Sequence, residues 1–411
     1  MIRKYNHLLY SIVTVWFLLT QSLPPFNLIM PFTGIVQVAI FVGVILLLYP
    51  SLLITRRVVV MLIYGLMTLI YFFMGNKFYP IINAVIVPFL FMISGLLISE
   101  YTFKYDKSFK YTKLVLITVL VCNVIMSVIT IPQFSVNPNI VYGTTVNRGM
   151  SESDRQMFSF VISYQTVHGI AIIMAPIAFF CKKLFYRNKK YCFLLSVASL
   201  LLLYVTYKSN STTAMLLSLL MTGVGLLIKL KKLDRRSIVH FVLLGSLGFI
   251  LIQPGVVIPL LKTIQSTMDT NSGNYKKLDE VQTKILFGES SGDLQLREER
   301  YNSSTTLFLE SPLTGTASPE KIGMHSFILD RLALFGLIFI IPLLLVFLYH
   351  YKSAYRQLNH TRVIYAFSVA GMLVMLYMKN DFEQGTWLYG FAYLPLLCRY
   401  IDFQIDKKYL K

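Results

Sequence analysis

The chain has 411 residues, of which 55% are hydrophobic and only 14% are charged, and its formal net charge is +19. Soluble globular proteins carry about 25% charged residues, so this composition excludes an ordinary soluble domain, and its hydrophobicity excludes intrinsic disorder. It also argues against a nucleic-acid-binding protein, because long apolar runs interrupt every basic cluster and leave no continuous basic stripe.

Apolar runs of the length that crosses a membrane as a helix, about 20 residues, recur along the whole chain. Twelve spans are predicted, near 7–23, 34–53, 58–74, 79–99, 114–132, 158–181, 191–207, 211–229, 237–261, 325–349, 363–379 and 386–400. None alternates as a barrel strand does, and helices satisfy their own backbone groups in lipid. The first span follows basic residues but lacks the small-residue cleavage site of a signal peptide. We therefore expect an all-α polytopic membrane protein, with residues 1–411 in one membrane domain.

The loop charges predict the orientation of these spans. With the N-terminus inside, the inner segments carry the basic clusters at 3–4, 56–57, 104–113, 182–190, 229–236, 352–362 and 399–411. The outer segments are then close to neutral. This is the positive-inside pattern, so we expect both termini to lie inside.

Two long outer loops stand out among otherwise short connections. One covers 133–157. The other, 262–324, lies between the ninth and tenth spans and mixes charged residues with apolar triplets at 285–287 and 307–309. Long loops in compact proteins are commonly functional. We expect the larger loop to form short amphipathic helices over the outer face and to carry part of an active site.

Histidine and charged residues within membrane spans are costly, so each is a candidate for function. His168 lies near the middle of the sixth span, where a neutral histidine hydrogen-bonded between helices is the simpler interpretation. His325 opens the tenth span, and a helix N-terminus disfavours imidazolium, so this residue is either a general base or a cap. Asp330 and Arg331 follow, and we expect them to pair with groups on other helices.

The outer side has few basic residues, and four of them are arginines in the two long loops: Arg148, Arg155, Arg297 and Arg300. Guanidinium groups bind phosphate in a bidentate manner, but each of these arginines also has acidic neighbours with which it could simply pair. The four cysteines, at 122, 181, 192 and 398, lie in spans or at their inner ends, so no outer disulfide framework is expected. Nucleotide-binding loops and metal-binding motifs are absent, and we expect no metal and no cofactor.

One ordered set of residues resembles the O-antigen ligase and Wzy-type polysaccharide polymerase family. The family pattern has an Arg, an aromatic residue four positions later and then Pro-Leu-Thr-Gly, which match Arg297, Tyr301 and residues 312–315. The pattern continues with a His that is followed by Asn or Ser, then by nine residues of any type and a Gly. His325, Ser326 and Gly336 match these positions. The family usually has a second Gly three residues further on, where this chain has Phe339. In the turn before the eighth span, Ser209 lacks the Arg that often follows it, and Lys208 is a candidate substitute.

The resemblance implies a bacterial cytoplasmic membrane enzyme with its active site on the outer face. Such an enzyme transfers a glycan from undecaprenyl diphosphate to a sugar hydroxyl without a nucleotide sugar or a metal. His325 would act as the base and Arg297 would stabilise the departing diphosphate. Arg300, Arg148, Arg155, Tyr301, Ser326 and Lys208 would contact the diphosphate or glycan. A flippase and a chain-length regulator are the protein partners that such a pathway implies.

Several functions remain open at this point. A polymerase of capsular polysaccharide, exopolysaccharide or O-antigen differs from a ligase only in its acceptor, which is another lipid-linked repeat or a terminal anchor. A flippase for the same lipid-linked unit also fits twelve spans with both termini inside. Flippases, however, usually show repeated halves, and residues 1–190 do not resemble 191–411. A non-enzymatic membrane scaffold is the remaining class.

Overall fold

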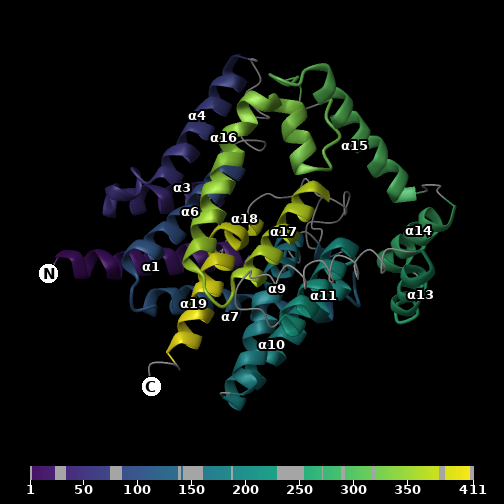
Figure 1. The fold of residues 1–411 in the computed structure, drawn as a ribbon, viewed down its shortest axis with the longest axis horizontal. Helices are drawn as coiled ribbons and strands as arrows, with labels where there is room; N and C mark the ends of the chain where they lie inside the picture. Colours follow the sequence, from purple (N-terminus) through teal and green to yellow (C-terminus); the bar gives the residue numbers. More distant parts are fainter. Residues whose placement is uncertain are drawn as a thin grey trace, which may run out of the picture.

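The computed structural model describes residues 2–23, 34–74, 86–137, 140–141, 161–186, 188–228, 254–270, 272–287, 292–316, 318, 321–378 and 385–407. Within these residues all regular structure is helical, and no strand is present, which confirms the expectation of an all-α chain (Figure 1). These segments form helices because long apolar runs without strict alternation favour helices that bury one face or all faces.

The first half of the chain forms a series of apolar helices. They are α1 (Ile2–Ser22), α3 (Gly34–Leu48), a 3₁₀ turn η1 (Pro50–Leu52), α4 (Arg56–Met74), α6 (Val87–Tyr105), α7 (Lys110–Gln133), α9 (Tyr164–Phe185), α10 (Lys189–Lys208) and α11 (Thr212–Leu227).

The second half begins with less apolar helices and returns to apolar ones. Its elements are α13 (Pro254–Gln265), α14 (Gly273–Phe287), α15 (Gly292–Glu310), α16 (Phe327–Gln357), α17 (Arg362–Met378), α18 (Gly385–Leu388), a π-helix η4 (Tyr389–Tyr393) and α19 (Leu394–Asp406). Helices α14 and α15 form most of the predicted large loop, so the expectation of helices within this loop is confirmed.

Among the described residues, three helices, α7, α9 and α10, are long and apolar enough to cross a membrane. The two parts of α16 would pass the same test together, and α3, α11 and α17 contain shorter apolar helices. Each predicted span overlaps a helix among the described residues, although residues 237–253 of the ninth span lie outside them. The structure therefore supports a membrane protein.

Helix α9 is the centre of the bundle. Most of its residues are buried, and it packs against α10, α11, α17 and the π-helix. Small residues make the closest of these contacts possible: a Cβ built at Gly225 of α11 would meet the backbone carbonyl of Ala175 in α9. Small residues at helix crossings are typical of membrane bundles, where close backbone approach provides the packing energy.

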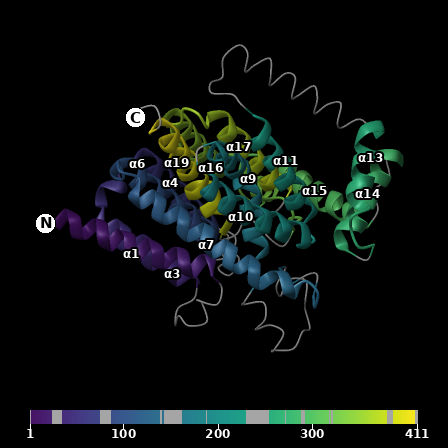
Figure 2. The ribbon, with the colours of Figure 1, turned by 90° about the horizontal axis from the view of Figure 1, so that it is seen from below.

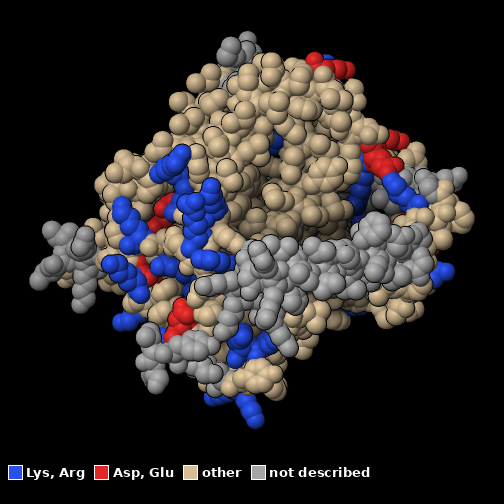
Figure 3. All heavy atoms as spheres, in the orientation of Figure 1, with Lys and Arg blue, Asp and Glu red and all other residues tan. Residues whose placement is uncertain are grey.

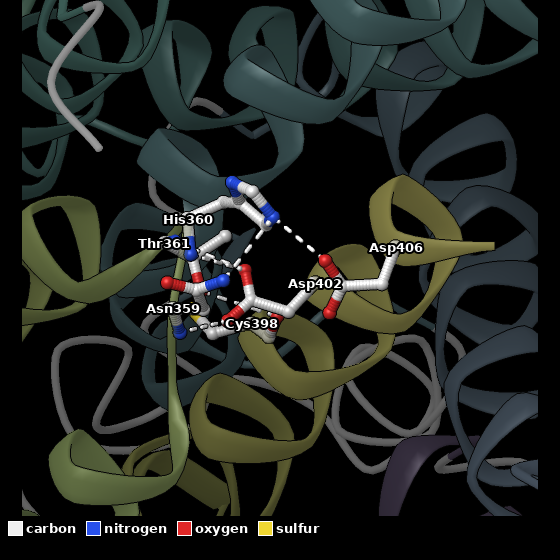
Figure 4. A network of polar contacts seen from close by, with 6 residues as sticks. All are labelled: Asn359, His360, Thr361, Cys398, Asp402 and Asp406. Carbon is white, nitrogen blue, oxygen red and sulfur yellow. Dashed lines mark hydrogen bonds and ion pairs between the residues drawn. The ribbon is translucent and has the colours of Figure 1, made fainter. Parts of the chain in front are cut away.

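A buried carboxylate connects the last helix to the turn that follows α16. Asp402 of α19 is 5% exposed and accepts hydrogen bonds from three consecutive backbone N–H groups, those of Asn359, His360 and Thr361, which lead into α17 (Figure 4). Burial raises the pKa of the Asp402 carboxyl, whereas these hydrogen bonds act in the opposite direction. Asp402 thus fixes the turn between α16 and α17 against the last helix.

Candidate active site

Helix α16 is broken at Gly336, a residue of the family pattern. Gly336 has φ 63° and ψ −173°, a backbone conformation that is essentially restricted to glycine. The parts Phe327–Ile338 and Ile340–Gln357 lie at 111° to each other, and Figure 1 shows them as an arch. The side chain of Phe339, which stands where the family has its second glycine, lies outside the described set. The first part of α16 is therefore a separate short helix that leads back from the break to His325.

The Pro-Leu-Thr-Gly segment docks directly on this break. Three backbone hydrogen bonds join the two: Leu337 N–H to Pro312 O (2.9 Å), Ile338 N–H to Leu313 O (3.1 Å) and Thr316 N–H to Ala333 O (2.9 Å). Breaking the helix frees the N–H groups of residues 337 and 338 from intrahelical partners, and the docked segment supplies acceptors for them. Segments of the family pattern that are distant in sequence thus form one backbone unit.

Two glycines make this docking possible. A Cβ built at Gly336 would come within 2.5 Å of Thr314 N, and one built at Gly315 within 2.6 Å of Phe335 N. Real Cβ atoms essentially never approach backbone atoms so closely. Each glycine is required because the backbone of the other segment occupies the place of its side chain.

His325 lies just before the short helix. We expected the span to begin at His325, but the helix begins at Phe327, because Ser326 is the N-cap and its hydroxyl accepts a hydrogen bond from Leu329 N–H (3.2 Å). The preceding Gly323 packs against the backbone carbonyl of Arg300 in α15, where a side chain would not fit. His325 is therefore on a capped loop that is held close to α15.

Asp330 and Ser304 fix this loop. The Ser304 hydroxyl donates to Asp330 Oδ1 (2.6 Å) and accepts from Gly323 N–H (2.9 Å), while Asp330 Oδ2 accepts from Ser326 N–H (3.1 Å). The expectation that Asp330 bonds with another helix is confirmed, since Ser304 belongs to α15. Both side chains are buried, so their hydrogen bonds hold the backbone on either side of His325.

Two residues of the family pattern, Tyr301 and His325, meet at this loop together with Arg300. Arg300 Nη1 lies 3.4 Å from His325 Nδ1, and the ring of Tyr301 is 5.8 Å from the imidazole. The Tyr301 hydroxyl also donates to the carbonyl of Met378, the last residue of α17, at 3.1 Å. Because guanidinium has no acceptor, Arg300 is the donor and His325 Nδ1 the acceptor when this contact is a hydrogen bond. The site therefore combines the imidazole of His325, the guanidinium of Arg300 and the phenol of Tyr301, which reaches the end of α17.

The other predicted site residues lie in different surroundings. Arg297 is one turn before Arg300 on α15. Lys208, at the end of α10, lies over the rings of Tyr204 and Tyr207 in its own helix. The guanidinium of Arg331 lies 4.9 Å from the ring centre of Phe327 in its own helix. Arg148 and Arg155 lie outside the described residues.

His168 has a contact that supports the simpler of its two interpretations. The residue is fully buried in α9, and its Nε2 lies 3.1 Å from the hydroxyl of Ser211, which directly precedes α11. The ring of Tyr164 packs edge-on against it. His168 is thus hydrogen-bonded between helices, as the sequence favoured.

A helical hairpin of α13 and α14 covers the turn between α10 and α11. Asn274 of α14 donates to the carbonyl of Tyr207 (3.0 Å) and accepts from the hydroxyl of Thr212 (2.8 Å), so it joins both helices of the turn. Figure 2 shows this hairpin at the end of the molecule away from α1. The second segment that resembles the family, 209–217, therefore contacts the large loop through α14.

Sequence reasoning missed Ser304 and Asn274. Ser304 carries a signal that could have indicated it: it follows Arg297 by seven residues and Arg300 by four, a spacing that places all three on one face of a helix. Asn274 carries no such signal, because its role depends on a tertiary contact. Among the described residues, no group of three or more His, Cys, Asp or Glu side chains could hold a metal ion.

No family model, curated protein or solved structure matches the chain.

Proposed function

We propose that the chain is a bacterial membrane glycosyltransferase that polymerises undecaprenyl-diphosphate-linked repeat units at the outer face of the cytoplasmic membrane. The observation that carries the proposal is the contact between His325 and Arg300 on a loop fixed by the family-pattern segments. Twelve spans with both termini inside remain part of the proposal. With that topology the end of α17, where the site lies, faces outward.

The proposed reaction is a single displacement. A sugar hydroxyl of the acceptor attacks the anomeric carbon of the donor glycan, and His325 takes the hydroxyl proton. The bond between the anomeric carbon and the diphosphate oxygen breaks, and undecaprenyl diphosphate leaves with the electron pair. Arg297 and Arg300 stabilise the negative charge on the leaving group, with Arg148 or Arg155 as further candidates. One displacement inverts the configuration at the anomeric carbon.

Arg300 links donor binding to base function in this proposal. In the free protein its guanidinium occupies His325 Nδ1, the nitrogen that carries the available lone pair. A bound diphosphate competes for the same guanidinium, because a charge-assisted hydrogen bond to phosphate is stronger than one to a neutral ring nitrogen. Donor binding would release Nδ1, so the base becomes available when the leaving group is in place.

The surroundings of the site suit a lipid-linked donor. Figure 3 shows the molecule hollowed beneath the arch of α16, with mostly uncharged side chains around the hollow. A polyprenyl chain requires a surface with few charges, while its diphosphate requires cations such as the arginines of α15.

The test is chain growth by the purified protein on a lipid-linked repeat unit, with no nucleotide and no energy source added. We expect polymer from the natural chain and a rate lower by about 10²–10⁴-fold for His325→Ala, as for the loss of a general base. Lys321→Ala is the matched control, because Lys321 is an exposed residue near the same loop. Its backbone N–H donates to Ser318 O and its backbone carbonyl accepts from the Ser303 hydroxyl, and alanine keeps both of these backbone groups.

Each alternative has a distinct outcome. Transfer to a terminal acceptor without chain growth would identify a ligase. Movement of the lipid-linked unit between leaflets without transfer would identify a flippase. The absence of both transfer and movement would support a non-enzymatic scaffold. Unchanged polymer from His325→Ala would overturn the assignment of the base.

A further inference from the structure

A second polar site lies far along the fold from His325, between the beginning of α4 and the end of α16. It is a pocket of about 330 Å³, lined by Arg56, Arg57, Tyr349, Lys352, Ser353 and Arg356. Figure 3 shows Lys and Arg side chains gathered over this part of the molecule. Nothing in the proposed reaction uses these residues.

The pocket has an excess of positive charge. Arg57 forms an ion pair with Glu100 of α6, so its charge is balanced within the protein. Arg56, Lys352 and Arg356 have no acidic partner in the part of the chain that the structure describes. Three cations around one pocket suit a phosphate, which accepts hydrogen bonds from several donors at once.

Tyr349 holds one of these cations in place. Its hydroxyl accepts a hydrogen bond from Arg56 Nη2 (2.6 Å), and the guanidinium of Arg56 lies 4.1 Å from the centre of the tyrosine ring. This contact joins α4 to α16 and fixes the position of the guanidinium, which reduces the entropy lost when an anion binds.

An exposed apolar stripe continues from the pocket along both helices. On α4, residues 59, 63, 66 and 70 follow Arg56 at helical spacing and are all exposed, Leu66 to 60%. On α16, Leu348 and Leu344 precede Lys352 by one and two turns and are exposed to 55% and 54%. A phosphate with acyl chains would match both features, because the chains would cover an apolar surface that water does not favour.

We propose that this pocket binds the headgroup phosphate of an anionic glycerophospholipid in the inner leaflet, with its acyl chains along α4 and α16. The proposed topology places both basic segments, 56–57 and 352–362, at the inner boundary of the membrane, where basic pockets between helices attract anionic headgroups. The inference depends on membrane insertion but not on glycosyl transfer.

The test is a binding titration of the purified full chain in neutral detergent, with phosphatidylglycerol, phosphatidylcholine and inorganic phosphate as separate probes and native mass spectrometry as the readout. We expect phosphatidylglycerol to bind in preference to phosphatidylcholine. The double variant Lys352→Gln/Arg356→Gln should raise the Kd for phosphatidylglycerol by about 25-fold, at about fivefold for each cation removed. The matched control Lys189→Gln/Lys190→Gln removes two exposed cations at the start of α10 and should leave the Kd unchanged.

Equal binding of the two lipids, or equal losses in the double variant and its control, would overturn the proposal. Displacement of phosphatidylglycerol by a similar concentration of inorganic phosphate would show a small-anion site instead. If the double variant does not fold, the comparison of the two lipids on the natural chain decides the question. A chain that binds phosphatidylglycerol selectively but makes no polymer would contradict the proposed function and leave this site in place.

Discussion

Replacement of Gly336 by alanine tests whether the docked Pro-Leu-Thr-Gly segment holds the break in α16. The new methyl group would lie within 2.5 Å of Thr314 N and would require φ 63° at a residue with a side chain. The chain then has two options. It can remain docked with a strained and overpacked backbone, or the segment 312–316 can detach from the helix.

The loss of stability in Gly336→Ala is set by whichever of these two options costs less free energy. Remaining docked costs about 1–3 kcal/mol for the backbone conformation and about 1–3 kcal/mol for the overpacking. Detachment removes three backbone hydrogen bonds, each with a net contribution of about 1 kcal/mol. We therefore expect a loss of about 3 kcal/mol, which raises the population of the detached state by roughly a hundredfold.

Hydrogen exchange measures this population directly. The amides of Leu337 and Ile338 are bonded to the docked segment, so their protection should fall by roughly a hundredfold in Gly336→Ala. Gly223→Ala in α11 is the matched control, because a Cβ there meets nothing within 4 Å. In that helix interior the alanine should stabilise the chain by about 1 kcal/mol. Equal protection of residues 337–338 in both variants would refute the reasoning.

Three further predictions concern other contacts. Ser304→Ala should lower the polymerisation rate, because it removes the hydrogen bonds that hold Asp330 and the loop before His325. Thr306→Ala, at an exposed position of the same helix, should leave the rate unchanged. Equal rates for the two variants would contradict the role of Ser304. Asp402→Asn places an amide against backbone donors and should lower the unfolding temperature near neutral pH. Burial raises the pKa of the Asp402 carboxyl above its value of about 4 in the unfolded chain, so the folded chain binds more protons between these two pKa values. The free energy of unfolding therefore decreases as pH rises through this range. The unfolding temperature of the natural chain should accordingly fall relative to that of the variant. Asn274→Ala should increase proteolysis of α13 and α14 by weakening their contact with the α10–α11 turn, which limited digestion would reveal.

The helices could be predicted from the sequence because their cause is local. Runs such as 114–132 and 191–207 are mostly apolar, and the observed helices Lys110–Gln133 and Lys189–Lys208 extend them by two to four residues at the start and by one residue at the end. The start of the tenth span was wrong by two residues because Ser326 caps the helix, and a cap competes with the simple extent of an apolar run.

The break in α16 could not be predicted because its cause is not local. A glycine within an apolar run is compatible with a continuous helix, and only the segment 312–316 shows that Gly336 takes another conformation. The same holds for the candidate site. The pattern indicated Arg297, Tyr301 and His325 as a set, but the arginine in contact with His325 is Arg300, one turn further along α15. The contacts that fix this loop, through Ser304 and Gly323, depend on how α15 packs.

The docked break also divides the chain into parts with different tolerance to changes in length. The hydrogen bonds between 312–316 and 333–338 close a loop that contains His325. Loop-closure entropy grows only with the logarithm of length, so doubling such a loop costs about 0.6 kcal/mol. Insertions between Thr316 and Lys321, before the backbone contacts of Lys321 and Gly323 with α15, should therefore cost little free energy. An insertion between Ala333 and Ile338 would shift the register of every bond that closes the loop. We therefore expect natural variation in length in the segment before His325 and not in the segment between His325 and Ile338.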